Sequence, residues 1–240
     1  MERLLDYFKP ENYKIELRIN KYTEEVQGKV SISGEKIGDI LKLHAKNLKI
    51  INVLVNNDRK NIEQDGDILS ILDVENGAVE IEIKYSFKLT HNMEGVYLST
   101  YEFETKEERI VSTQFESHYA REGFPCVDEP EAKATFDLKI IDTDSEDIIL
   151  SNMPAKSEKV LEYTSVDPDE NPEGGVNLSK KVKRKIVEFE TTPKMSTYLL
   201  AFVIGKFNKV SAKNLHGVEV TTYAALNQPV SMLKFPNEIA

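Results

Sequence analysis

The feature that most constrains the fold is a period-two alternation of apolar and polar residues that recurs along most of the chain. It is clearest over residues 13–19 and 79–89, where every second residue is Tyr, Phe, Ile, Leu or Val. Successive side chains of a β-strand point to opposite faces, so this alternation separates a buried face from a solvated one. Shorter stretches of the same kind lie at residues 30–32, 136–140, 187–189 and 218–222. We predict half-buried strands at all of these places.

Apolar runs extend this β interpretation to most of the remaining chain. Runs bounded by turn residues lie at residues 47–56, 68–72 and 148–150. Residues 198–207 are almost continuously apolar, as a strand buried on both faces would be. Helix is nearly absent: one turn is expected at 118–123, and a helix within 230–240 requires Pro236 in its first turn. Many short strands at roughly ten-residue spacing predict an all-β fold, a sandwich of several packed sheets.

One segment departs from this pattern in composition. Residues 164–185 are rich in Pro, Gly and acidic residues and end in a run of Lys and Arg at 180–185. Because such composition disfavours regular structure, we predict a long, mobile hairpin loop between two strands. The basic run is either a docking site for an acidic partner or a solvated face.

Charge and cysteine content limit the classes of partner and the compartment. A net charge of −10 disfavours nucleic acid as a partner, because binding phosphates requires a basic surface. No apolar run reaches the roughly 18 residues of a membrane span, so no membrane partner is expected. The single cysteine, Cys126, has no intrachain disulfide partner, which favours a reducing compartment. We therefore expect a cytoplasmic protein.

Motifs that would complete an active site are absent from these residues. The four histidines include no pair at HExxH spacing, and CxxC, GxSxG and Gly-rich phosphate loops do not occur. His118 has no nucleophile–base partner nearby in sequence, and Cys126, between Pro125 and Val127, is expected to be a buried structural thiol. We predict neither catalytic nor metal-binding residues in this segment.

The most distinctive motif is Thr113-Gln114-Phe115-Glu116, which precedes a proline-bounded acidic segment at 125–130. On a strand over residues 110–116, Gln114 and Glu116 project from one face and Phe115 from the other. A carboxylate and an amide displayed together at the end of a strand can form a small recognition site. They can equally be two solvated polar residues on a sheet face.

The surrounding stretch 110–136, IVSTQFESHYAREGFPCVDEPEAKATF, resembles the zinc aminopeptidase family that includes aminopeptidase N, puromycin-sensitive aminopeptidase and leukotriene hydrolase. The N-terminal domains of that family carry a T-Q-F-E…A-R…F-P-C-x-D-E-P signature. Further family markers occur in the same order at 43–45 (LHA), 95–97 (GVY), 152–154 (NMP) and 191–202 (TTPKMSTYLLAF).

This resemblance implies an antiparallel, saddle-shaped β-sandwich domain over residues 1–225, followed at 226–240 by the first helix of a catalytic zinc domain. The G-x-M-E-N and HExxH motifs of that zinc domain do not occur here. We therefore expect this segment to be inactive alone, with zinc held in a catalytic domain of the same polypeptide or of a separate subunit. An exposed apolar patch is expected where the two domains meet.

In the family, the Gln of this motif lines the pocket for the first substrate side chain, and the Glu binds the free α-amine. The resemblance assigns these roles to Gln114 and Glu116, with peptide N-termini as the partner. A carboxylate in a partly desolvated cleft distinguishes an ammonium from an internal amide through a charge-assisted hydrogen bond.

The chain departs from the family pattern just after the motif. Ser117, His118, Tyr119, the pair 122–123 and Val127 differ from the residues usual there, which affects the loop rather than the two contact residues. A structural network of ion pairs or capping contacts is expected from Arg121, Asp128 and Glu129.

Two other interpretations remain open at this point. A non-catalytic interaction or scaffold module could have the same fold. A carbohydrate-binding β-sandwich is a third class, but it would need exposed aromatic platforms, and the chain has no Trp.

Overall fold

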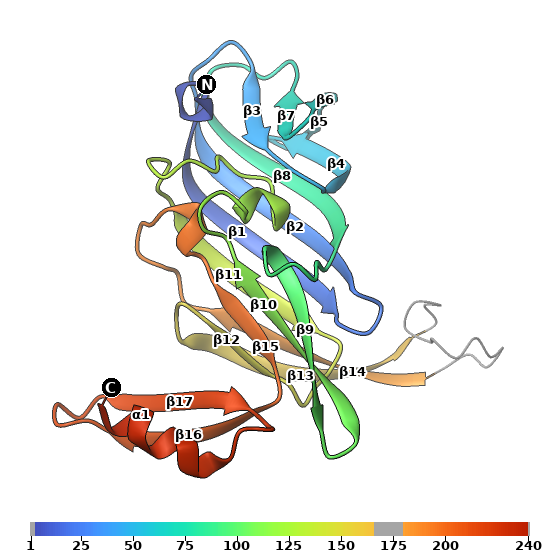
Figure 1. Cartoon of the computed structure of the whole chain (residues 1–240). Coiled ribbons are helices and arrows are strands. Elements are labelled where there is room, and N and C mark those ends of the chain that lie inside the picture. The colour runs from blue at the N-terminus through green and yellow to red at the C-terminus, as the bar shows by residue number, and fades with distance from the viewer. Residues whose placement is uncertain (1–2, 166–179, 240) are drawn as a thin grey trace.

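A computed structural model describes residues 3–165 and 180–239, and it confirms the all-β prediction (Figure 1). The largest sheet has eight strands, in the order β13 (Ala155–Ser165), β14 (Lys180–Phe189), β11 (Thr135–Asp142), β1 (Phe8–Asn20), β2 (Glu25–Lys36), β8 (Gly77–Lys88), β4 (Lys49–Val55) and β5 (Asp58–Arg59). The only parallel ladder between these strands joins β1 to β11 within the described chain.

Three smaller sheets accompany the large one. The four-stranded sheet has the order β12 (Ile148–Ser151), β15 (Phe202–Gly205), β10 (Lys106–Gln114) and β9 (Gly95–Phe103). The other two are β3 (Leu41–His44), β7 (Ile68–Ile71) and β6 (Ile62–Asp65), and the hairpin of β16 (Phe207–Lys213) and β17 (Glu219–Ala225). Figure 1 shows the four-stranded sheet lying across the large sheet, with the β16–β17 hairpin at the C-terminal end of the molecule.

Within residues 3–165 and 180–239, helical structure is limited to short segments. Single 3₁₀ turns lie at η1 (Leu4–Asp6), η2 (Ala120–Glu122), η4 (Thr197–Leu199) and η5 (Val230–Leu233), and η5 continues into α1 (Lys234–Ile239). The turn predicted at 118–123 is confirmed as η2, and Pro236 lies in the first turn of α1, where its missing N–H costs nothing. No helix in the described ranges has the length and apolar composition needed to cross a membrane.

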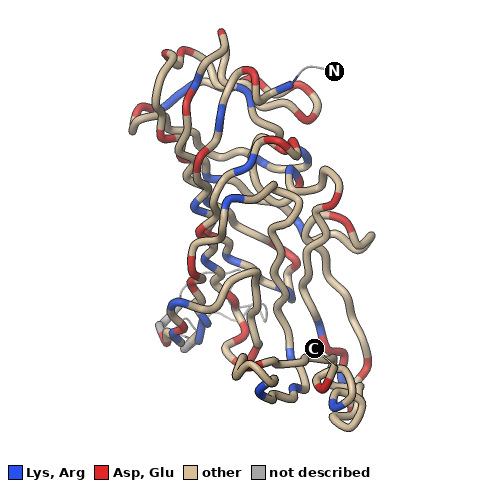
Figure 2. The backbone as a smooth tube through the Cα atoms, turned by 90° about the vertical axis from the view of Figure 1, so that its left-hand side faces the viewer, with Lys and Arg blue, Asp and Glu red and all other residues tan. Residues whose placement is uncertain are grey.

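The core lies between the large sheet and the smaller sheets that cover it. In β1, Tyr13, Ile15, Leu17 and Ile19 are buried while the residues between them are more exposed, as the alternation predicted. The Tyr13 ring stacks on Phe136 at 5.1 Å, which joins the two parallel strands by their side chains. Charges of both signs are interspersed along the backbone rather than gathered in one basic stripe (Figure 2).

One glycine is required by the packing of this core. A Cβ built on Gly28 would lie 2.2 Å from Cζ of Tyr85, which is paired with it across the β2–β8 ladder. Tyr85 is fully buried and its hydroxyl donates to the carbonyl of Gly123 at 3.1 Å. The large ring therefore occupies the space that any other residue at position 28 would need.

The segment predicted as one strand over 198–207 differs in the structure. Its first part belongs to η4, β15 ends at Gly205, and β16 begins at Phe207 in a different sheet. Leu199 is half exposed, so burial on both faces was a wrong expectation. The turn forms because the buried Thr197 hydroxyl donates to the Asp128 carboxylate at 2.6 Å, which holds the chain away from an extended path.

The two strands that flank the predicted loop at 164–185 extend further into this segment than expected. β13 and β14 pair in register up to the partners Ser165 and Lys180, so the basic run at 180–185 belongs to a strand. Lys185 is held there because its ammonium meets the Glu158 carboxylate at 2.7 Å and the Asp147 carbonyl at 2.8 Å. The rest of the predicted loop, residues 166–179, lies outside the described residues.

The C-terminal residues form a small unit around the β16–β17 hairpin. The Asn237 amide donates to the carbonyls of Val210 and Val220 at 3.2 and 2.9 Å, which docks α1 on the hairpin. Six apolar side chains in the described part of this unit are exposed: Leu215, Val218, Val230, Met232, Phe235 and Ile239. The domain boundary near residue 225 stays a prediction.

Candidate functional site

The two predicted recognition residues lie at the end of β10, on the exposed side of the chain. Gln114 is the last residue of β10 and pairs with Gly95 of β9. The predicted strand over 110–116 therefore ends two residues early, and Glu116 lies in the turn that follows. Both side chains are exposed while Phe115 between them is buried, so the alternation continues past the end of the strand.

Phe115 anchors the beginning of this turn in the core. Its ring meets Phe124 edge to face at 6.0 Å, and it lies so close to Gly123 that a Cβ there would be 2.9 Å from its Cζ. The glycine at 123, one of the departures from the family pattern, therefore makes room for the Phe115 ring.

Tyr119 anchors the other end of the turn. Its backbone N–H donates to the Phe115 carbonyl at 2.9 Å, and its hydroxyl donates to the Glu94 carboxylate at 2.8 Å. That hydrogen bond is the main cause that raises the pKa of Tyr119 above its ordinary value. The sequence did not indicate this role for Glu94, because the alternation does not relate a loop residue to a partner 25 positions away.

Between these anchors, the Glu116 carboxylate is free to meet a ligand. No hydrogen bond or ion pair to it is formed within the part of the chain that the structure describes. An exposed carboxylate without a partner among the described residues can form a charge-assisted hydrogen bond with an incoming cation. The Glu116 carboxylate therefore lies on an exposed turn that Phe115 and Tyr119 hold at its two ends.

The hydroxyl of Ser117 lies next to the imidazole of His118, a contact that was not predicted from the sequence. The Ser117 Oγ and His118 Nδ1 atoms are 2.8 Å apart, and the imidazole stacks on the Tyr119 ring. A catalytic Ser–His pair needs a third group that orients the imidazole, and none does so among the described residues. Both side chains are exposed, so the contact is a surface hydrogen bond.

The acidic segment behind the turn forms the predicted structural network. Arg121 Nε donates to the buried Asp128 carboxylate at 3.1 Å. The Glu129 carboxylate accepts the backbone N–H groups of Leu4 and Leu5 at 2.6 and 3.3 Å, which ties η1 to this segment. The expectation of ion-pair and capping roles is confirmed for all three charged residues.

A buried histidine completes this network and was not assigned a role from sequence. His44 pairs by its backbone with Cys126, and its Nδ1 accepts the backbone N–H of Asp128 at 3.1 Å. Burial, followed by the nearby charge of Arg121, lowers the pKa of His44 to about 4. The imidazole is therefore neutral and structural at physiological pH. Cys126 is fully buried, as predicted.

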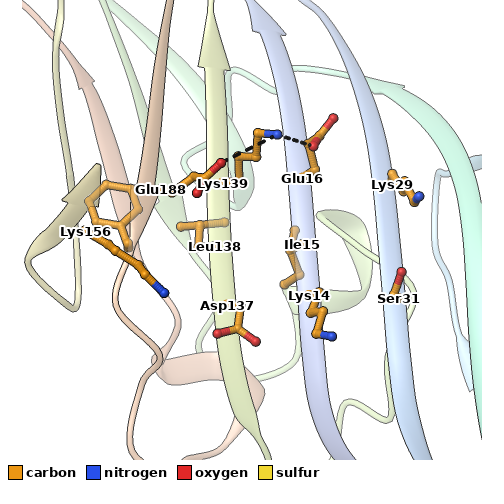
Figure 3. Close-up of a pocket in the computed structure, with 11 residues that line it drawn as sticks. Lys14, Ile15, Glu16, Lys29, Ser31, Asp137, Leu138, Lys139, Lys156 and Glu188 are labelled. Carbon is orange, nitrogen blue, oxygen red and sulfur yellow. Dashed lines mark ion pairs between the residues drawn. The ribbon is translucent and has the colours of Figure 1, made fainter. Parts of the chain in front are cut away.

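A hollow on the solvent-facing side of the large sheet (Figure 3) has neither Gln114 nor Glu116 among its lining residues. Lys139 lies at its centre, with its ammonium 2.9 Å from the Glu16 carboxylate and 3.8 Å from the Glu188 carboxylate. These contacts form a row of alternating charges across β1, β11 and β14, which is typical of a solvated sheet face. No group of three His, Cys, Asp or Glu suited to a metal ion occurs in the described ranges.

Comparison with known proteins agrees with the sequence signature. A family model described as the Peptidase M1 N-terminal domain matches residues 9–170. Aminopeptidase N of Lactococcus lactis subsp. lactis is 40% identical over 242 residues, covering 99% of this chain and 26% of the relative. Puromycin-sensitive aminopeptidase of Caenorhabditis elegans is 33% identical, covering 92% of this chain and 23% of the relative.

The name of a third relative describes an interacting factor rather than an aminopeptidase. The Tricorn protease-interacting factor F2 of Thermoplasma acidophilum is 35% identical over 173 residues, covering 72% of this chain and 19% of the relative. The chain thus spans about a fifth to a quarter of the length of these curated relatives.

Proposed function

The chain belongs to the peptidase M1 family, whose N-terminal domain it contains, and from this we propose that it is the substrate-recognition domain of a zinc aminopeptidase. Such an enzyme removes N-terminal residues from peptides. The observation that carries the proposal is the Glu116 carboxylate, which is exposed on a turn held at both ends and has no partner among the described residues.

Glu116 would bind the free α-amine of a peptide substrate, and Gln114 would contact its first side chain. An ammonium gains a charge-assisted hydrogen bond from Glu116, whereas a blocked N-terminus leaves the carboxylate without a cation. This difference would select peptide ends over internal peptide bonds.

The chemistry itself would come from the part of the longer relatives that this chain does not cover. Zinc activates a water molecule in such enzymes. The described residues offer no suitable set of metal ligands, so the metal would be held by that other part of the polypeptide. We also propose a cytoplasmic location, which the single buried Cys126 supports because it forms no disulfide.

The test is peptidase activity of the complete polypeptide with Glu116→Gln, which removes the charge and keeps the shape. A hydrogen bond to a charged group contributes about 1.5–3 kcal/mol, so kcat/KM for aminoacyl amides should fall roughly 10- to 150-fold. Glu102→Gln, on the exposed surface of β9, is the matched control and should leave kcat/KM unchanged. Activity of the Glu116 variant near that of the wild type would refute the proposed role.

A second candidate function is a non-catalytic interaction module. The relative named as a Tricorn protease-interacting factor favours it, because that name describes an interaction. Under this alternative the complete polypeptide would show no zinc-dependent hydrolysis of aminoacyl amides at all. The same assay therefore separates the two functions before any variant is made.

A further inference from the structure

We propose that the hydrogen bond from Tyr119 to Glu94 positions the Glu116 carboxylate for the substrate amine, so that Tyr119 and Glu94 are positioning residues for recognition. This inference rests on the proposed role of Glu116. It concerns the turn over residues 115–119, in which Glu116 lies between the anchors Phe115 and Tyr119.

The turn depends on the hydrogen bond between Tyr119 and Glu94, because the residues in the middle of the turn are exposed and do not pack in the core. Glu116, Ser117 and His118 all lie at the surface, and the contact between Ser117 and His118 joins two residues of the turn itself. At the first end, Phe115 is only 2% exposed and packs in an aromatic cluster. At the other end, the Tyr119 hydroxyl makes the side-chain hydrogen bond that ties the turn to a different loop.

The position of Glu94 is restricted by hydrogen bonds within its own loop. One oxygen of its carboxylate accepts the Asn92 amide at 2.9 Å, and the other accepts the Tyr119 hydroxyl. Its backbone carbonyl accepts the Thr90 hydroxyl at 2.7 Å. The Tyr119 hydroxyl is therefore bound to a carboxylate whose position is already restricted.

This loop leads directly to the strand end that carries Gln114. Gly95, the residue after Glu94, pairs with Gln114 and has a φ of +67°. A Cβ at Gly95 would lie 3.3 Å from the Cβ of Glu122, whose carboxylate is in turn 2.9 Å from the Lys46 ammonium. The Glu94 loop, the end of β10 and η2 thus meet at one place, and the Tyr119–Glu94 hydrogen bond sets the position of Glu116 relative to Gln114.

A charged group that is held in place before binding loses less conformational entropy when the substrate arrives. Removing the tether leaves the charge of Glu116 intact but lets the turn occupy other conformations. We therefore expect weaker binding of the substrate with little change in the chemical step, which appears as a higher KM at nearly constant kcat.

The experiment measures KM and kcat of the complete polypeptide with an aminoacyl amide substrate. Tyr119→Phe removes only the hydroxyl and should raise KM roughly three- to thirtyfold, part of the effect of a hydrogen bond to a charged group. Glu94→Ala should act similarly, whereas Glu94→Gln keeps an oxygen acceptor and should restore most of the affinity. Tyr22→Phe is the matched control, because its hydroxyl also donates to a carboxylate, that of Asp144 at 3.1 Å.

The double variant Tyr119→Phe/Glu116→Gln separates the two proposals. If Tyr119 acts through Glu116, its substitution should have no further effect on KM once the Glu116 charge is gone. The same effect in both backgrounds, or no effect of Tyr119→Phe on KM, would overturn this inference while leaving the role of Glu116 standing. If Glu116→Gln alone changes nothing, the proposed function fails and this inference fails with it.

Discussion

Replacing Asp142 with asparagine should make the folded chain more stable at alkaline pH. Asp142 and Asp147 are fully buried, and the buried Lys21 ammonium forms ion pairs with Asp147 and, at 3.4 Å, with Asp144. Neither oxygen of Asp142 receives a hydrogen bond from the described residues. Burial, and after it the charge of Asp147, raises the pKa of Asp142 to about 8. Asp142 therefore keeps its proton in the folded state at neutral pH.

The sign and size of the effect follow from linkage between protonation and folding. An unfolded Asp has a pKa of about 3.9, so between that value and about 8 only the folded state binds this proton. The free energy of unfolding then falls by about 1.4 kcal/mol per pH unit as the pH rises through this window. Asparagine has no proton to lose, so the free energy of unfolding of the variant lacks this dependence on pH.

The full window would correspond to about 6 kcal/mol. This value is an upper limit, because the pKa of Asp147 is also raised by burial in the same site. A gain of about 2–3 kcal/mol at pH 8 should raise Tm by roughly 5–10 °C in a chain of this size.

Thermal unfolding followed by circular dichroism at pH 5, 6.5 and 8 is the assay. The Tm difference between Asp142→Asn and the wild type should be small at pH 5 and largest at pH 8. Asp144→Asn is the control: burial acts to raise the pKa of Asp144, but the Glu146 N–H and Lys21 hold it below its ordinary value. That control should destabilise the chain at neutral pH. A Tm difference for Asp142→Asn that is negative at pH 8, or the same at every pH, would contradict a raised pKa of Asp142 in the folded state.

Three further predictions concern the core. Gly28→Ala should destabilise the chain by about 1–3 kcal/mol or more in urea unfolding, because the new Cβ would clash with the buried Tyr85 ring, and unchanged stability would contradict this. Cys126 is buried and its pKa is raised by that burial, so a thiol reagent should label it only after unfolding, and rapid labelling of the native chain would be the contrary result. In the folded state His44 has a pKa of about 4, whereas an unfolded His binds its proton near pH 6.5. The free energy of unfolding should therefore fall by up to about 3 kcal/mol as the pH drops from 6.5 to 4. Urea unfolding at pH 4.5 and 7 should show this loss, and His44→Asn, which keeps an acceptor for the Asp128 N–H, should reduce it.

The period-two alternation and the signature at 110–136 were sufficient to predict most of the strands, the faces they bury and the family of the domain. The alternation of residues 13–19 predicted which side chains of β1 are buried, because the two faces of a strand differ in period two whatever the strand pairs with. The same rule placed Gln114 and Glu116 outside and Phe115 inside. The signature around them identified the family because those residues stand in a fixed local order.

Which distant segments meet became evident from the folded structure. It placed β1 beside β11 in parallel, joined Lys21 to a carboxylate 126 positions away, and brought the Glu94 loop against Tyr119. It also broke the apolar run at 198–207 with a turn, through a hydrogen bond between Thr197 and Asp128. A period-two pattern states which face of a strand is buried, but it carries no information on strand order. Contacts between side chains of separate loops depend on that order, and therefore on the packing of the whole chain.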